Sequence, residues 1–183
     1  MHKRIALNGL ALLGLFASST VLAETLPGFY AGAGLGQATI EVDDVGFDAD
    51  DTAFKVFGGY NFNQYFAVEV SYFDAGEPDQ DFGGGTVAVG IDGLNASAIG
   101  RLPLGEVFSL FGKIGFASYD AEISARVGGS TVFSESGSED DLSYGFGGAF
   151  NLGSSFELRA EYEAFDIEDG NFNILSVSGL FKF

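Results

Sequence analysis

The chain has no cysteine and no tryptophan, only three prolines, and a single histidine, His2. Without cysteine, disulfides, thiolate nucleophiles and cysteine-built zinc sites are excluded. Basic residues are also scarce, with 8 Lys and Arg against 26 Asp and Glu and a formal net charge of −18. This balance excludes nucleic acid as a partner, because binding to its phosphates needs clustered Lys and Arg.

The first 23 residues have the pattern of a secretory signal peptide. A basic start is followed by the segment 5–16, which is apolar apart from Asn8 and two glycines. Small and β-branched residues then lead to Ala23 and Glu24, so we expect cleavage between these two. A membrane anchor is the alternative, but the apolar run is too short for an uninterrupted span. Cleavage leaves one domain, 24–183, that contains no histidine.

Within this domain, large apolar residues alternate with polar or small ones at a period of two, which is the pattern of a β-strand. In 156–164, for example, apolar residues alternate with charged ones. Eight such segments are predicted, at 28–39, 52–62, 66–75, 89–102, 107–120, 141–152, 155–166 and 173–183. Short links are expected at 63–65, 103–106 and 153–154, and long loops at 40–51, 76–88, 121–140 and 167–172.

Short turns at one end and long loops at the other are typical of an outer-membrane barrel. The segment lengths fit the roughly 9–11 residues that a tilted strand needs to cross hydrocarbon. The predicted fold class is therefore all-β, an eight-stranded antiparallel up-and-down transmembrane β-barrel. We expect a monomer with both chain ends on the periplasmic side.

The charged residues indicate which strand face points inward. Five basic and four acidic strand residues lie opposite the large apolar side chains, while Arg126 is assigned to a loop. In lipid the apolar face points outward, and opposite charges can pair in the narrow lumen of an eight-stranded barrel. The predicted lumen charge network consists of Lys55, Glu69, Arg101, Lys113, Glu157, Arg159, Glu161, Glu163 and Lys182.

Aromatic residues gather near the ends of the predicted strands, where transmembrane barrels carry two interfacial girdles. The girdle near the short links is assigned Phe29, Tyr30, Phe62, Tyr65, Phe66, Phe108, Phe150 and Phe156. Tyr72, Phe116 and Tyr144 are assigned to the girdle near the long loops. The last segment ends on Phe183, which shares the lipid-facing parity of Phe181.

The stretches 28–36 and 58–62, together with the last strand ending in Phe183, resemble the eight-stranded outer-membrane barrel family. This family includes the OmpA transmembrane domain and the OmpX-type barrels. The resemblance implies a location in the outer membrane of a Gram-negative bacterium, among its lipid and lipopolysaccharide. It also implies that Phe183 belongs to the signal read by the barrel-assembly machinery. A peptidoglycan-binding domain, which often follows OmpA-type barrels, is not expected after Phe183.

Acidic clusters lie mainly in the predicted long loops. They are Asp43-Asp44, Asp48 to Asp51, Asp79 to Asp81, Glu139 to Asp141 and Asp166 to Asp169. Such oxygen-rich loops can hold Ca²⁺ or Mg²⁺ loosely, but solvated loops are the expectation, and no specific metal site and no cofactor is assigned. The acidic fringe predicts negligible binding to polyanions such as heparin in the absence of divalent cations.

The predicted function is non-catalytic, a structural or surface role in the outer membrane. The domain has no histidine base, and paired carboxylates need a substrate-accessible cleft, which a packed lumen does not offer. Three alternatives stay open: a small passive pore, an adhesion protein acting through 121–140, and a soluble lipocalin-like carrier. The missing tryptophan counts against the carrier.

Overall fold

The computed structural model describes residues 27–42, 47–77, 79–82, 85–127, 130–166 and 171–183. The predicted signal peptide, 1–23, and its cleavage site between Ala23 and Glu24 lie outside these ranges. None of the described residues forms a helix that is long and apolar enough to cross a membrane.

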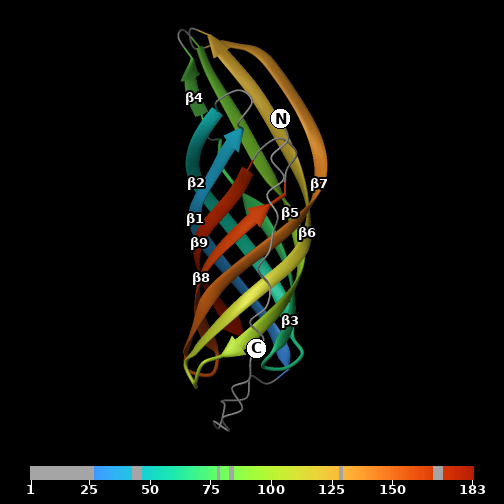
Figure 1. Ribbon diagram of the computed structural model, residues 1–183, viewed down its shortest axis with the longest axis vertical. Helices are drawn as coiled ribbons and strands as arrows, with labels where there is room; N and C mark the ends of the chain where they lie inside the picture. The colour runs from blue at the N-terminus through green and yellow to red at the C-terminus, as the bar shows by residue number, and fades with distance from the viewer. Residues whose placement is uncertain (1–26, 43–46, 78, 83–84, 128–129, 167–170) are drawn as a thin grey trace, which may run out of the picture.

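Nine strands form one antiparallel sheet that closes on itself (Figure 1). They are β1 (Gly28–Val42), β2 (Phe47–Asn61), β3 (Phe66–Asp74), β4 (Asp79–Phe82), β5 (Gly85–Pro103), β6 (Phe108–Val127), β7 (Ser130–Leu152), β8 (Phe156–Phe165) and β9 (Asn171–Lys182). Consecutive strands pair, except that β3 pairs with β5, and the pairing of β1 with β9 closes the barrel. The short β4 only extends the sheet beside the far end of β5. The predicted eight-stranded antiparallel barrel is therefore confirmed.

The long loops predicted at 40–51, 76–88 and 121–140 are wrong, because strands continue into all three. β1 reaches Val42, β4 lies inside the second segment, and β6 and β7 stay paired as far as Val127 and Ser130. Arg126 consequently lies in β6, opposite Thr131, and not in a loop. Antiparallel pairing can continue past the membrane wherever two neighbouring strands still satisfy each other's backbone groups.

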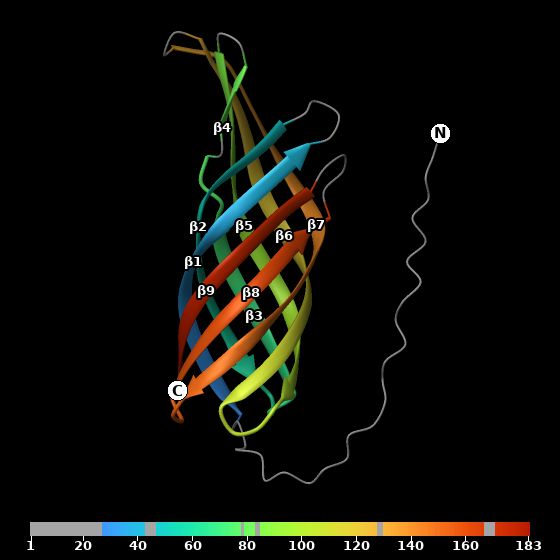
Figure 2. The same ribbon diagram turned by 60° about the vertical axis from the view of Figure 1, so that its left-hand side comes forward.

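This continued pairing makes one side of the barrel much taller than the other. In both views β5, β6 and β7 extend well beyond the ends of β8 and β9 (Figure 2). β7 pairs with β8 only from Ser143 onward, whereas it pairs with β6 along its whole length. We call this end of the barrel the long-strand end and the opposite end, which carries the C-terminus, the short-turn end.

The outward face carries a band of large apolar side chains. On β6 it runs from Phe108 to Phe116, and on β7 from Leu142 to Leu152. Toward the long-strand end, polar residues replace the apolar ones at one level around the barrel. The first polar outward positions are Gln37, Thr52, Asp74, Asp92, Ser118, Asp140, Asp166 and Asn173. The band between this ring and the short turns is the part of the barrel that fits hydrocarbon.

Most of the aromatic residues assigned to the girdles lie at the edges of this band. Phe29, Phe62 and Phe66 are exposed near the short turns, and Phe116 and Tyr144 near the polar ring. Tyr30 is the exception, because its side chain is 2% exposed and points into the lumen. The assignment of Tyr30 to the girdle is wrong, since β1 places even-numbered residues inward.

Candidate functional site

The lumen holds all nine charged residues that the sequence pattern groups together. Eight of them are buried, and Lys182 is partly exposed at the short-turn end. They come from β2, β3, β5, β6, β8 and β9, and the alternation of each strand turns them inward. Ion pairs link them into one connected network.

Glu157 is the centre of the layer nearest the short turns. Its carboxylate lies 3.0 Å from Nη1 of Arg101, 2.7 Å from Nζ of Lys182 and 2.8 Å from Nε of Arg159. The Glu157 side chain is fully buried. Burying this carboxylate is acceptable only because several cations replace its hydration.

Toward the long-strand end, β8 contributes two further carboxylates to the network, those of Glu161 and Glu163. Glu161 lies 2.6 Å from Nζ of Lys55 and 2.8 Å from Nζ of Lys113. Glu163 pairs with the same two lysines. This layer therefore ties β8 to β2 and β6 across the lumen.

Arg159 and Glu69 together join the two layers, because Arg159 pairs with Glu157 and Glu69 lies 3.8 Å from Nζ of Lys113. Nη1 of Arg159 lies 2.6 Å from Glu69, whose carboxylate also accepts a hydrogen bond of 2.9 Å from the Tyr30 hydroxyl. The guanidinium lies over three aromatic rings, 5.0 Å from Tyr30, 5.4 Å from Phe57 and 5.5 Å from Phe111. Ion pairs and ring stacking together hold this buried arginine in one position.

An apolar layer, which the sequence pattern did not predict, fills the lumen beyond Glu163. Phe73, Phe165 and Phe172 form its centre, with ring centroids 4.7 to 6.1 Å apart. Ile40, Ile91 and Ile174 pack in the same cluster. A signal for this layer exists, because Phe73 and Phe165 share the inward parity of Glu69 and Glu163. It is easily overlooked, since large apolar residues are expected on the lipid face.

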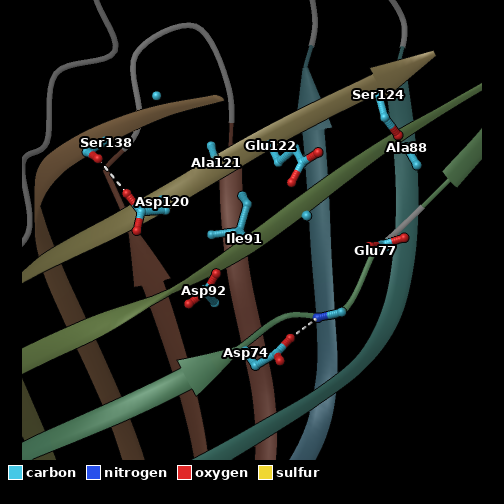
Figure 3. A pocket seen from close by; sticks show the side chains of 13 residues that line it. Asp74, Glu77, Ala88, Ile91, Asp92, Asp120, Ala121, Glu122, Ser124 and Ser138 are labelled. Carbon is cyan, nitrogen blue, oxygen red and sulfur yellow. Dashed lines mark hydrogen bonds between the residues drawn. The ribbon is translucent and has the colours of Figure 1, made fainter. Parts of the chain in front are cut away.

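A hollow of about 840 Å³ opens on the outside of the barrel above the apolar band (Figure 3). It lies over β5 and β6, next to the segment that follows β3. Five carboxylates line it: Asp74 of β3, Glu77 in the segment after β3, Asp92 of β5, and Asp120 and Glu122 of β6. Asp120 accepts a hydrogen bond from the Ser138 hydroxyl of β7. They come from three separate stretches of the sequence, 74–77, 92 and 120–122, so local clustering does not group them.

The acidic clusters found in the sequence do not form a recognisable metal centre in the described part of the chain. Across those residues, no three His, Cys, Asp or Glu side chains are close enough together to hold an ion. Asp43-Asp44 and Glu168-Asp169 lie outside the described ranges. Loose binding of divalent cations to these acids stays a prediction.

Tyr119 lies toward the long-strand end of the lumen, beyond the apolar band. Its hydroxyl donates hydrogen bonds to Asp141 and to Glu139, the latter at 3.5 Å. Burial, followed by the hydrogen bond to Asp141 and the two neighbouring negative charges, raises the pKa of Tyr119 well above the usual value of 10.0. The phenol therefore stays neutral at any physiological pH.

A closed barrel with an apolar outer band and a paired ionic interior defines an integral membrane protein of the transmembrane β-barrel class. The chain belongs to the family described as outer membrane protein beta-barrel domain, which it matches over residues 9–183. No curated protein sequence matches the chain. The family places it among the integral proteins of the outer membrane.

Solved structures share this fold at low sequence identity. Ail of Yersinia pestis, the attachment invasion locus protein, is 21% identical with a TM-score of 0.62, over 86% of this chain and 99% of Ail. Neisserial surface protein A is 20% identical with a TM-score of 0.65, over 85% of this chain and 97% of its own. The N-terminal barrel domain of Pseudomonas aeruginosa OprF is 14% identical with a TM-score of 0.59, over 85% of this chain and 98% of that domain. At these identities the likeness is one of fold.

Proposed function

We propose that this protein is a closed, non-catalytic surface protein, whose barrel anchors the tall β5–β6–β7 sheet outside the cell. The filled lumen is the observation that carries this proposal. Two ionic layers around Glu157 and Glu163 are followed by the apolar layer around Phe73. Apolar constrictions exclude water and ions even when a pore is wide enough to admit them.

The same packing argues against catalysis in the lumen. Each lumen carboxylate contacts a lysine or an arginine and is almost completely buried. A general acid or base must reach a substrate atom within hydrogen-bond distance. None of these four groups is free to do so without breaking an ion pair.

Single-channel recording in planar bilayers tests the closed state. The expected result is the absence of reproducible conductance steps, with a known porin as positive control for the bilayer. Regular steps would contradict the proposal and favour the alternative of a small pore. If regular steps are seen, the variant Lys113→Glu shows whether the current passes through the lumen. Its ion selectivity differs from that of the wild type only if ions pass the lumen charges.

Surface attachment is the second candidate, and the length of β6 and β7 favours it. Their paired tips end far above the apolar band, where only soluble or cell-surface partners can reach them. Ail, by its name an attachment protein, has the same fold. In this chain acids such as Asp120 and Glu139 lie on the tall sheet, so we propose a partner with cationic groups.

A shortened sheet tests attachment without disturbing the barrel. Ala121 and Gly137 are directly paired, so 122–136 can be replaced by a two-residue Asn-Gly turn. Loss of cell binding by this variant supports attachment. The shift in gel mobility on heating serves as the check that the barrel is folded. If this shift is unchanged and the shortened protein still binds cells fully, attachment through the tall sheet is eliminated.

A further inference from the structure

The hollow above the apolar band contains three aspartates in a row across neighbouring strands (Figure 3). In the strand register, Asp74 of β3 lies directly opposite Asp92 of β5, and Asp92 lies directly opposite Asp120 of β6. All three are exposed on the outward face of the barrel. We call these three residues the aspartate row.

The aspartate row is an unfavourable arrangement without a counter-ion. Directly opposed residues of an antiparallel pair have Cβ atoms about 4.5–5.5 Å apart, and like charges in this arrangement are destabilising. Among the described residues, the row accepts hydrogen bonds from neutral donors, the hydroxyls of Tyr72 and Ser138 and the backbone N–H of Gly76. None of the described residues that line the hollow is basic. A bound cation would therefore relieve a repulsion that the lining itself leaves in place.

The hollow offers room for such a cation directly beside the row. Its volume of about 840 Å³ is within the range of small-molecule sites, and it opens to the outside of the barrel. Small residues, Ala88 and Gly90, line it next to the carboxylates. A Cβ at Gly90 would lie 3.6 Å from the Glu77 side chain, so the glycine keeps this part of the hollow open.

The spacing of the row decides which kind of cation fits. In the described part of the chain, no three carboxylates are close enough together to share one metal ion. Side chains on one face of an extended peptide recur about every 6.6 Å, whereas neighbouring strands are about 4.7–4.9 Å apart. Two amino groups joined by three methylene groups are about 5 Å apart in an extended chain, because four bonds of about 1.5 Å separate them. This last spacing matches the aspartate row.

We propose that the aspartate row binds a linear polyamine whose ammonium groups are separated by three methylene groups. Each ammonium group pairs with one aspartate, and the polyamine lies across β3, β5 and β6 within the hollow. The site is on the outside of the barrel, so it is independent of whether the lumen conducts. The shortened variant that lacks 122–136 keeps all three aspartates, so attachment and polyamine binding can fail separately.

Isothermal titration calorimetry with norspermidine tests this proposal. Norspermidine has three ammonium groups, with three methylene groups between neighbours, and the matched control is the diamine of the same length that has a methylene group in place of the central amine. The chain without its predicted signal peptide is folded in a non-ionic detergent and titrated with each compound at constant ionic strength. The expected result is saturable one-to-one binding of norspermidine, about tenfold tighter than that of the diamine. Equal affinities, or no saturable binding, would overturn the proposal.

A pair of variants provides a second measurement. Asp92→Asn removes the central carboxylate of the row, whereas Asp166→Asn removes an exposed carboxylate of the same polar ring that does not line the hollow. Asp92→Asn should weaken norspermidine binding about tenfold and change diamine binding by less than about twofold, because only norspermidine has an ammonium group opposite Asp92. Asp166→Asn should change neither by more than about twofold, since distant exposed charges are screened.

Two results of the variant measurement contradict a specific site. Equal losses of norspermidine binding in Asp92→Asn and Asp166→Asn would show attraction to the acidic surface as a whole. Binding of Mg²⁺ that is tighter than that of norspermidine, and is lost in Asp92→Asn, would show a metal site instead. If Asp92→Asn does not fold, as judged by the gel shift on heating, the comparison of norspermidine with the diamine on the wild type still decides the question.

Discussion

Replacement of Arg159 by methionine is the most informative perturbation of the lumen. Arg159 is 2% exposed and pairs with Glu69 at 2.6 Å and with Glu157 at 2.8 Å. Removing one partner of a buried ion pair costs about 3–5 kcal/mol, because the remaining charge stays buried without compensation. Glu157 keeps Arg101 and Lys182, so most of the loss falls on Glu69.

The expected loss in the free energy of unfolding for Arg159→Met is about 4 kcal/mol, within the range for a broken buried pair. Among the residues that the structure describes, Glu69 would retain the Tyr30 hydroxyl at 2.9 Å and Lys113 at 3.8 Å. The double variant Arg159→Met/Glu69→Gln removes the stranded charge as well. It should recover about 2 kcal/mol, because contacting residues couple by about 0.5–3 kcal/mol.

Reversible urea unfolding in lipid vesicles measures both values. The chain has no tryptophan, so far-ultraviolet circular dichroism and the gel shift on heating follow the transition. Glu106→Gln, an exposed charge change in a turn, serves as control and should stay within about 0.5 kcal/mol of the wild type. A loss below about 1 kcal/mol for Arg159→Met, or a double variant no more stable than the single one, would refute the reasoning on buried pairs.

Four further outcomes are expected. Ile114→Arg, on the lipid face at the middle of the apolar band, should cost about 2–4 kcal/mol, whereas Ser118→Arg, at the polar ring, should cost about 0–1 kcal/mol in the same urea assay. Gly147→Ala should destabilise by about 1–3 kcal/mol, because its Cβ would lie 2.3 Å from the Ala160 carbonyl oxygen and 2.6 Å from the Phe111 ring; Gly112→Ala, whose nearest neighbour would be 3.8 Å away, is the matched control, and equal effects would contradict the packing argument. The difference in absorbance at 295 nm between the wild type and Tyr119→Phe should show Tyr119 ionising only well above pH 10; since its folded pKa is raised, the stability it contributes is complete below pH 10 and falls as pH rises further, and Tyr119→Phe should weaken the alkaline dependence of stability. Retention on a heparin column should be negligible in EDTA, because acids dominate the long-strand end, and strong retention there would contradict the predicted acidic fringe.

The fold is largely predictable from the sequence because lipid imposes a strict pattern. Every transmembrane strand must present apolar side chains outward, and the period of two then turns the other residues inward. The segment 156–164 shows this plainly, with its charges on one parity. Parity alone identifies the nine lumen residues, without knowledge of any contact between them.

The extent of the strands is less predictable. The segment 121–127 continues the alternation of β6, with Ala121, Ile123, Ala125 and Val127 on one parity, yet a loop is expected there. Length is the reason, because a strand of roughly 9–11 residues already crosses the hydrocarbon. Whether pairing continues beyond that point depends on a neighbouring strand that continues with it, and for β6 this neighbour is β7.

The number of barrel strands, the face that each strand turns to lipid, and the set of charges in the lumen all follow from the order of the amino acids along the chain. Each depends on local alternation, which the solvent around a strand dictates. The pairing of those charges depends on the folded barrel, because Lys55 and Glu161 meet across the lumen from positions 106 residues apart. The contact among the rings of Phe73, Phe165 and Phe172 also depends on the folded barrel. These rings close the lumen beyond the ion pairs. Parity places these rings inside, but closure and stagger of the barrel bring them to one level.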